Sequence, residues 1–373
     1  MKTVAITGHE GFVARHVARA LTRAGDVRIR TLPRERDLLQ PDALPQFLDG
    51  ADVVLHLAGV NRAAADAEFV TGNVETTRTL LAAMAATGAR PLLVYASSMQ
   101  AYKDTVYGKS KRQAEDLIRE AGQSLALPYE ILRITNVFGA GCKPFYNSVV
   151  ATFCHQVARG EEPTVLQDAP VALVSVTRVA TEMARLVAGW DGAPRSVLRD
   201  LTTQDTITVS ALRDLLSRFA RCRREGLVPE FASQLERELY ATLLTYYPAQ
   251  DWIAGLVKHT DARGDLVESF RLERQGQVFF STSGPGVVRG NHCHARKVER
   301  FLVVSGDAEI NLRHLDATDV TTFRVSGDAP KVVEIPVDHA HNIRNVGSGT
   351  LTLLVWVNER FDPADPDTFP ATV

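Results

Sequence analysis

The feature that most constrains the fold of this chain is a change of hydrophobic pattern near residue 261. Before that point, short apolar runs alternate with longer amphipathic segments, a pattern typical of βα units that build a parallel sheet. After it, helical periodicity disappears and short apolar runs are separated by Gly, Asp and Pro turns. We therefore expect an α/β chain in which a doubly wound parallel sheet is followed by an all-β domain.

The expected elements follow from the same pattern. In the first part, strands are expected at residues 3–6, 27–32, 53–57, 92–96 and 130–134, and helices at 12–24, 74–86 and 108–120. In the second part, strands are expected at residues 278–281, 301–305, 309–313 and 351–357. The 373 residues suit two domains of roughly 100 to 200 residues each. We place the boundary after the last helical stretch, which gives domains 1–247 and 248–373.

The composition argues against several classes of protein. Lys and Arg number 42 and Asp and Glu 44, whereas a nucleic-acid binder would gather a basic excess on one face. No apolar run reaches the roughly 18 residues of a membrane span, and the N-terminal apolar stretch is too short for a signal peptide. The four cysteines form no CxxC pair, so we expect a reducing, cytoplasmic location.

A glycine turn at residues 7–14 joins the first expected strand to the first helix. Gly8 permits a tight turn, and Gly11 lets the backbone approach a pyrophosphate. Phe12 and Val13 open the helix whose N-terminus would face that anion. The turn predicts a dinucleotide site in a Rossmann-like fold, and a glycine turn that binds nothing is the alternative.

The residues after the second expected strand bear on the choice of cofactor. NAD-preferring sites usually place Asp or Glu there, to hold the ribose 2′-hydroxyl. Here Arg34 would grip a 2′-phosphate, which favours NADPH. Glu35 leaves room for NAD, and Arg34 as an ordinary solvated charge is a third interpretation.

Tyr107 and Lys111 form a Tyr-x-x-x-Lys pair that lies on one face of an expected helix. An ammonium beside a phenol favours the ionised phenol, so we expect the pKa of Tyr107 to fall from about 10 and a proton to be shuttled during hydride transfer. Ser98 would hydrogen-bond the same substrate oxygen. An ordinary surface pair is the alternative, but the glycine turn and the His-Leu-Ala-Gly segment at 56–59 favour a reductase.

These motifs together resemble the extended short-chain dehydrogenase/reductase family, whose members commonly act on nucleotide sugars. The resemblance implies Ser98, Tyr107 and Lys111 as the catalytic set, with Lys111 also touching the nicotinamide ribose. It further implies that the cofactor is lined by Leu57, Ala58 and Gly59. The reaction expected from this family is NADPH-dependent transfer of hydride to a ketone.

A segment at residues 133–139 looks like the Arg-x-x-Asn-Val-x-Gly segment of that family, which lines the substrate side and implies a substrate contact for Asn136. The sequence departs from the family in two places. The interval between Ser98 and Tyr107 is short, and residues 175–179 replace an Asp-rich segment. Because of the second departure, it stays open whether residues 175–179 provide the helix cap or the substrate contact of the family's segment.

The all-β part carries a group of metal-ligand residue types. His292 and His294 are two apart, so they face one side of a strand while Cys293 faces the other. Glu299 returns from the next turn, and His341 adds a third imidazole. Three imidazoles and a carboxylate suit Zn²⁺ or another divalent first-row metal. Surface histidines on a polar turn are the alternative.

The spacing of this group resembles the two cupin motifs, over residues 286–306 and 336–345. The resemblance implies a cupin, or jelly-roll, barrel that binds a metal through His292, His294, Glu299 and His341. Asp338 stands where the second motif usually has glycine, so we expect unusual backbone geometry there. The roles of His314 and His339 stay undecided.

The whole chain resembles CapF-type enzymes of bacterial capsular polysaccharide synthesis, through residues 56–62, 142–148, 289–292 and 361–368. The resemblance adds Lys143 and Asn147 to the substrate residues and implies a homodimer. It implies a UDP-2-acetamido-2,6-dideoxy-4-hexulose substrate, C3 epimerisation by the cupin, and reduction of the C4 ketone with NADPH. The product would be a UDP-2-acetamido-2,6-dideoxy-L-talose on the route to UDP-N-acetyl-L-fucosamine.

Other functions stay open from the sequence. The cupin would be non-catalytic in a 4-ketoreductase or epimerase that acts on another 4-keto-6-deoxy sugar nucleotide. A nucleotide-sensing protein is a third class, which the intact Ser98, Tyr107 and Lys111 argue against. The residue that acts as base in epimerisation is not assigned.

Overall fold

A computed structural model describes residues 1–32, 38–202 and 206–373. The chain forms two compact units, which we call the N-terminal unit (residues 1–217 and 233–247) and the C-terminal unit (residues 218–232 and 248–373). The segment 218–232 belongs to the C-terminal unit, although the sequence analysis places it before the boundary. The cause is a short parallel pairing of β10 (Leu227–Val228) with β12 (Gly264–Leu272).

The N-terminal unit is built on a six-stranded sheet of order β2-β1-β3-β4-β5-β8, in which every pairing is parallel. This confirms the predicted Rossmann-like sheet. Its strands are β1 (Lys2–Thr7), β2 (Val27–Thr31), β3 (Val53–His56), β4 (Leu92–Ser98), β5 (Tyr129–Ile134) and β8 (Ser196–Leu201). The strand order reverses between β1 and β3, and ligands of such sheets bind in the crevice beyond the carboxyl ends of the strands at that point.

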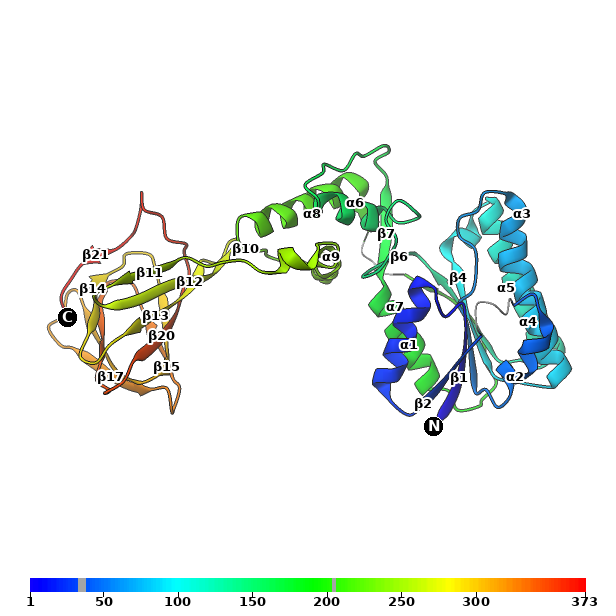
Figure 1. The fold of residues 1–373 in the computed structure, drawn as a ribbon, viewed down its shortest axis with the longest axis horizontal. Helices are drawn as coiled ribbons and strands as arrows, with labels where there is room; N and C mark the ends of the chain where they lie inside the picture. Colours follow the sequence, from blue (N-terminus) through cyan, green and yellow to red (C-terminus); the bar gives the residue numbers. More distant parts are fainter. Residues whose placement is uncertain (33–37, 203–205) are drawn as a thin grey trace. The chain divides into compact units, whose positions relative to one another are not determined.

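Helices cover both faces of this sheet (Figure 1). One face packs on α1 (Phe12–Ala24) and α7 (Val176–Ala188), and the other on α2 (Leu44–Leu48), α4 (Thr76–Thr87) and α5 (Val106–Ser124). Because side chains alternate across a strand, Val4 and Ile6 of β1 enter the first core while Ala5 enters the second. A strand buried on both faces is therefore apolar throughout, which is why the sequence shows these strands as continuous apolar runs.

The remaining elements of this unit lie between and beyond the sheet strands. A small sheet joins β6 (Asn136–Phe138), β7 (Pro170–Ser175) and β9 (Thr206–Thr208). Further helices are α3 (Asp66–Phe69), a π-helical turn (Val70–Glu75), α6 (Val149–Val157), α8 (Val209–Arg224) and α9 (Gln234–Leu244), with short 3₁₀ turns at Pro41–Ala43 and Met99–Tyr102. The end of α8, from Arg218, and a third 3₁₀ turn at Ala249–Trp252 belong to the C-terminal unit. None of the described helices is long and apolar enough to cross a membrane.

The C-terminal unit consists of two β-sheets packed on one apolar core, as predicted for an all-β domain. One sheet has the order β10-β12-β13-β20-β15-β18, with β11 paired to β12, and the other has the order β17-β16-β19-β14-β21. The strands not yet given are β11 (Lys258–Asp261), β13 (Gln277–Ser283), β14 (Val288–Cys293), β15 (Glu299–Ser305), β16 (Asp307–His314), β17 (Thr321–Ser326), β18 (Val332–Ile335), β19 (His339–Asn345), β20 (Leu351–Val357) and β21 (Phe369–Pro370).

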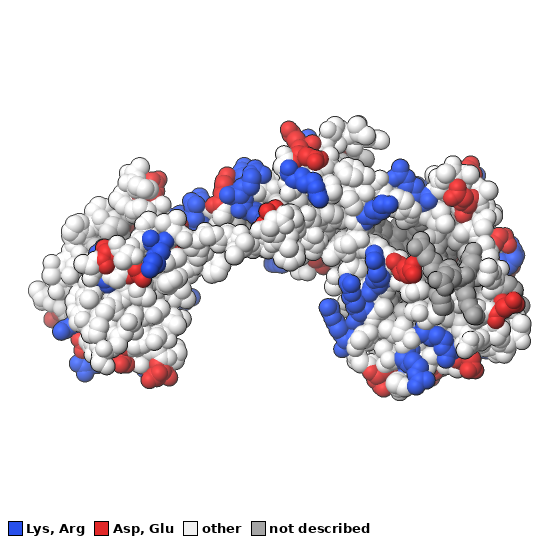
Figure 2. Space-filling model, viewed as in Figure 1, with Lys and Arg blue, Asp and Glu red and all other residues white. Residues whose placement is uncertain are grey.

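The surface charges of the two units are mixed in sign. On the face shown in Figure 2, Lys and Arg side chains are interspersed with Asp and Glu. This pattern agrees with the near balance of 42 basic and 44 acidic residues in the sequence.

Candidate active sites in the two units

The glycine turn lies in the crevice where the strand order reverses. Gly8 has a φ of 65°, and a Cβ atom there would lie 2.7 Å from the Cα of Ala58, which follows β3. The N–H of Gly11 donates to the carbonyl oxygen of Gly8 at 2.9 Å, and α1 begins at the next residue. The turn therefore brings backbone N–H groups and the start of α1, with Phe12 and Val13, to the edge where a pyrophosphate would bind.

A buried histidine fixes this crevice. His56 has Nδ1 2.8 Å from the Thr7 hydroxyl and Nε2 3.0 Å from the Thr77 hydroxyl. The Thr7 oxygen also accepts from the N–H groups of Leu57 and Ala58, each at 3.2 Å. Burial, aided by the charge of Lys111, lowers the pKa of His56 to about 3, so it stays neutral. His56 is thus a scaffold residue that holds the ends of β1 and β3 together.

Lys111 reaches into the same region from α5. Its Nζ donates to the Ala96 carbonyl at 2.8 Å and lies 4.2 Å from the centre of the Tyr95 ring. A Cβ at Gly59 would lie 3.8 Å from this Nζ, so Gly59 is a direct neighbour of the buried ammonium. Burial lowers the pKa of Lys111 to about 7, against the opposing effect of the Glu115 carboxylate.

Tyr107 and Ser98 lie together, as predicted, but the pKa of Tyr107 differs from the expectation. Burial raises it above its usual value, and the hydrogen bond with Ser98 offsets only part of that effect. The Lys111 ammonium is directed to the Ala96 carbonyl, so it does not lower the phenol pKa here. Tyr107 is therefore protonated at neutral pH, which suits a proton donor.

The sequence analysis missed a buried ion pair beneath these residues. Glu115 is fully buried one turn after Lys111, and its carboxylate accepts from Arg133 at 2.6 and 2.9 Å and from the Ser97 hydroxyl at 2.5 Å. These bonds tie α5 to the ends of β4 and β5. The i, i+4 spacing of Lys111 and Glu115 is the signal that would have placed both on one helix face.

A second missed residue is Asn73, in the π-helical turn. Its side chain is buried and bonds both the N–H and the carbonyl of Val60 at 2.9 Å, and the hydroxyl of Ser110 at 3.0 Å. A Cβ at Gly59 would lie 2.8 Å from its Oδ1. The loop that carries Gly59 is thus held against α5. π-Helical turns often occur at functional sites, but no pattern in the sequence predicts this one.

Of the predicted substrate residues, Lys143 belongs to a small cationic group with Arg62. Asn136 and Asn147 are exposed, and the Asn136 amide donates to the Ala172 carbonyl at 3.1 Å. The Lys143 ammonium lies 5.6 Å from the centre of the Tyr146 ring, and the Arg62 guanidinium lies 5.7 Å from the same ring.

Two further predictions concern the ends of strands. Arg34 lies outside the described residues. The open question of the helix cap at residues 175–179 has an answer, because the Ser175 hydroxyl accepts from the Arg178 N–H and caps α7. Residues 175–179 differ from the family pattern, but they still cap the helix, because serine is a good N-cap residue.

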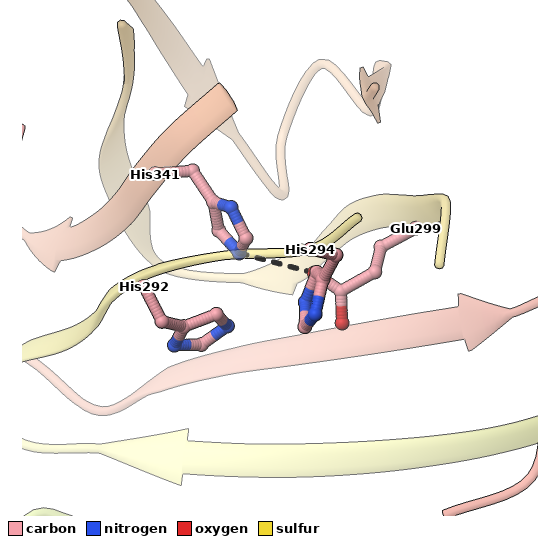
Figure 3. A group of neighbouring side chains, drawn as sticks. All are labelled: His292, His294, Glu299 and His341. Carbon is pink, nitrogen blue, oxygen red and sulfur yellow. Dashed lines mark ion pairs between the residues drawn. The ribbon is translucent and has the colours of Figure 1, made fainter. Parts of the chain in front are cut away.

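In the C-terminal unit, the four predicted metal ligands converge (Figure 3). Their ligand atoms all lie within 4.8 Å of one another. His292 is the next-to-last residue of β14 and pairs in register with His341 of β19, while Glu299 begins β15 in the other sheet. The Glu299 Oε2 lies 3.1 Å from Nε2 of His341 and 3.5 Å from Nε2 of His294. The group therefore lies between the two sheets.

This group has the properties of a metal site. The Nε2 atoms of His294 and His341 and Oε2 of Glu299 are buried without a hydrogen-bond partner of regular geometry among the described residues. Burial is the main cause that lowers the pKa of His292 to about 4, and the nearby His341 adds to this effect. The His292 imidazole is therefore neutral and free to bind a cation. Although burial opposes it, the adjacent imidazoles lower the pKa of Glu299 to about 2. Buried, converging lone pairs of this kind fit a divalent first-row metal.

Residues around the cluster agree with the sequence-based expectations. Asp338 has a φ of 58°, which confirms the unusual backbone predicted there. Cys293 is buried but is not part of the cluster. His314 and His339 contact each other, with ring centres 5.0 Å apart, and neither joins the four ligands.

Two protein families match the chain. The NAD dependent epimerase/dehydratase family matches residues 4–172, and the polysaccharide biosynthesis C-terminal domain matches residues 259–369. Among curated proteins, the chain is similar to a UDP-2-acetamido-2,6-beta-L-arabino-hexul-4-ose reductase of Pseudomonas aeruginosa. The two are 34% identical over 372 residues, which cover 99% of this chain and 98% of the other.

Solved structures give the same result over the full length. The capsular polysaccharide assembling protein CapF of Staphylococcus aureus is 37% identical, with a TM-score of 0.86 and 100% of both chains covered. The protein RMD of Pseudomonas aeruginosa, solved with NADPH, is 23% identical over 66% of this chain and 99% of its own, with a TM-score of 0.56. The second likeness concerns the fold alone.

Proposed function

Because the chain belongs to the family of CapF-type polysaccharide biosynthesis enzymes, we propose that it carries out two reactions on one nucleotide sugar. The C-terminal unit, as a cupin, inverts C3 of a UDP-2-acetamido-2,6-dideoxy-4-hexulose, and the N-terminal unit reduces the C4 ketone with NADPH. The product is a UDP-2-acetamido-2,6-dideoxy-L-talose, on the route to UDP-N-acetyl-L-fucosamine. At the coarser level, the chain is an NAD(P)-dependent nucleotide-sugar reductase/epimerase.

The observation that carries this proposal is the presence of two separate reactive groups in one chain. Ser98, Tyr107 and Lys111 lie around the crevice of the parallel sheet, and a four-ligand metal group lies in the other unit. A reductase that acted alone would need only the first group. The second supports a step that requires polarisation of a carbonyl.

In the reduction, Tyr107 is the proton donor. NADPH, when bound in the crevice, supplies hydride to C4. The Tyr107 phenol, which burial keeps protonated, gives its proton to the C4 oxygen, and Ser98 holds that oxygen by a hydrogen bond. The Lys111 ammonium, held by the Ala96 carbonyl, offers a positive charge beside the cofactor.

In the epimerisation, the C-terminal unit acts on the carbon next to the ketone. A divalent metal held by His292, His294, Glu299 and His341 would withdraw electrons from the C4 carbonyl and acidify the C3 proton. Loss and return of that proton on opposite faces inverts C3. The chain's own contribution is to hold three imidazoles and one carboxylate in a buried position between two sheets.

We also place the diphosphate of the substrate near Arg62 and Lys143. Both cations lie over the Tyr146 ring, and Arg62 donates to the backbone carbonyl of Phe145 at 3.1 Å, which holds the loop of Lys143. Arg62 lies three residues after Gly59, which is next to Lys111. A diphosphate bound there would leave the sugar directed toward Tyr107, with Asn136 and Asn147 as further substrate contacts.

Two variants and one control test this division of labour. Tyr107→Phe should lower NADPH oxidation by about 10²- to 10⁴-fold while the metal content stays unchanged. His292→Ala should lose the metal and the exchange of the C3 proton with solvent, whereas His314→Ala should keep both. Purified protein without a divalent metal, with epimerisation unimpaired by His292→Ala, would overturn the metal half. Reduction without C3 exchange would favour a 4-ketoreductase with a non-catalytic cupin.

Three features are inferred from the family and not from contacts between residues of the structure. NADPH is preferred over NADH, the metal is zinc, and the enzyme is a cytoplasmic homodimer. Titration of both cofactors measures the first, elemental analysis of purified protein the second, and light scattering in solution the oligomeric state.

A further inference from the structure

The C-terminal tail, residues 359–370, contributes to the surroundings of the metal group. Its β21 pairs with β14, with Pro370 opposite His292 and Phe369 opposite Cys293. Earlier in the tail, Pro366 accepts from the buried Lys297 ammonium at 2.7 Å. The tail therefore contacts residues that precede His294 in the sequence and a residue that follows it.

Asp367 makes the closest contacts of this tail. It is 3% exposed, and its carboxylate accepts from three successive N–H groups, those of Ala295 at 3.2 Å, Arg296 at 3.1 Å and Lys297 at 2.9 Å. These residues form the turn between the ligands His294 and Glu299. One buried side chain thus holds the turn that sets the separation of two ligands.

The backbone of Asp367 acts on His294 itself. Its carbonyl oxygen lies 2.5 Å from Nδ1 of His294. Because a carbonyl only accepts, Nδ1 must carry a proton, and in the neutral imidazole Nε2 then holds the lone pair that a metal would bind. That Nε2 lies 3.5 Å from Oε2 of Glu299, among the other ligand atoms. A φ of 42° at Asp367 gives the backbone the bend that allows carbonyl and carboxylate to reach neighbouring targets.

We propose that Asp367 is a positioning residue of the metal centre. Its carboxylate fixes the turn between His294 and Glu299, and its carbonyl fixes the tautomer and ring orientation of His294. This inference rests on the proposed function, since it requires that the four-residue group binds a metal. Partners that orient a metal-ligating histidine typically contribute about 10- to 100-fold to metal affinity.

The test compares variants of Asp367 with a variant of its neighbour Asp365. Asp365 lies in the same tail but is exposed, and its carboxylate accepts from the Arg296 side chain at 2.7 Å. The full-length protein is stripped of metal, and Zn²⁺ affinity is measured by competition with a chromophoric chelator. Asp367→Ala should weaken Zn²⁺ binding by about 10- to 100-fold, and Asp365→Ala should leave it unchanged.

A second variant and a second readout separate positioning from a loss of folding. Asp367→Asn keeps one acceptor and tolerates a positive φ, so it should fold and weaken binding to a smaller extent. With Co²⁺ in place of Zn²⁺, the visible absorption bands of the Asp367 variants should shift because the ligand field changes, while those of Asp365→Ala should match the unaltered protein.

The possible results distinguish the two proposals. If the unaltered protein binds neither Zn²⁺ nor Co²⁺, the metal half of the proposed function fails. If it binds both, and the two folded Asp367 variants match Asp365→Ala in affinity and spectrum, the positioning role of Asp367 is overturned.

Discussion

The close approach at Gly8 permits a sharp test of the cofactor crevice. In Gly8→Ala, the new Cβ would lie 2.7 Å from Cα and 2.8 Å from N of Ala58, and both are backbone atoms. The Ala58 atoms must move until they lie at least 3.4 Å from the new Cβ, which is ordinary van der Waals contact. The positive φ of 65° costs a further 1 to 2 kcal/mol or so. Because overpacking costs about 1 to 3 kcal/mol, the total destabilisation should be about 2 to 5 kcal/mol.

A matched control separates the two effects. Gly88 has a φ of 70° at the end of α4, but a Cβ there would meet nothing within 4 Å. Gly88→Ala should therefore cost only the 1 to 2 kcal/mol or so of backbone strain. Thermal melting with and without NADPH measures stability, and quenching of protein fluorescence measures NADPH affinity.

The two variants should differ most in cofactor binding. Moving Ala58 opens the crevice where the pyrophosphate binds, so the Kd for NADPH should rise by about tenfold or more in Gly8→Ala, which corresponds to about 1.4 kcal/mol. The Kd should stay unchanged in Gly88→Ala. Equal NADPH affinity and equal melting temperatures in the two variants would refute the argument that Gly8 is required for close approach.

Four further predictions concern the two sites. Burial lowers the pKa of Lys111 to about 7, so kcat/KM for reduction should fall as pH rises through about 7. In Glu115→Gln the loss of the carboxylate lowers the pKa of Lys111 further, so the fall in kcat/KM should begin at lower pH. The exposed Asp116→Asn is the control, and identical pH profiles for the two variants would contradict this prediction. The same Glu115 variant leaves the Arg133 charge unpaired, so a loss of stability of about 3 to 5 kcal/mol should appear in melting experiments. Arg62→Ala should raise KM for the nucleotide sugar by about 10- to 100-fold with little change in kcat, as steady-state kinetics would show. Dialysis against a chelator should abolish C3 exchange and leave NADPH affinity unaltered, and full exchange in metal-free protein would contradict this.

Much of the fold could be predicted because its signals are local. The inner strands β1 and β3 of the parallel sheet are largely buried on both faces, so they appear as apolar runs, and the glycine turn follows the first of them. The four metal ligands could also be predicted, since His292 and His294 lie two residues apart at the end of β14. In each case the residues that matter are spaced by the period of the element that carries them.

The remaining features depend on contacts between distant residues. Asp367 lies 73 residues from its partner His294, and no periodic pattern links them. The ion pair of Glu115 and Arg133 likewise joins a helix to a strand. The predicted fall in the pKa of Tyr107 was wrong because it considered only the neighbouring charge, whereas burial of the phenol has the larger effect.

The measurement that tests the central claim most directly is deuterium retention at C3. The protein is incubated with NADPH and a UDP-2-acetamido-2,6-dideoxy-4-hexulose in D₂O, exchangeable protons are returned, and the reduced product is analysed by mass spectrometry and NMR. Two reactions in one chain predict one carbon-bound deuterium at C3 of the reduced sugar. They also predict that Tyr107→Phe exchanges the C3 proton without consuming NADPH. A reduced product without deuterium would contradict a catalytic role for the C-terminal unit.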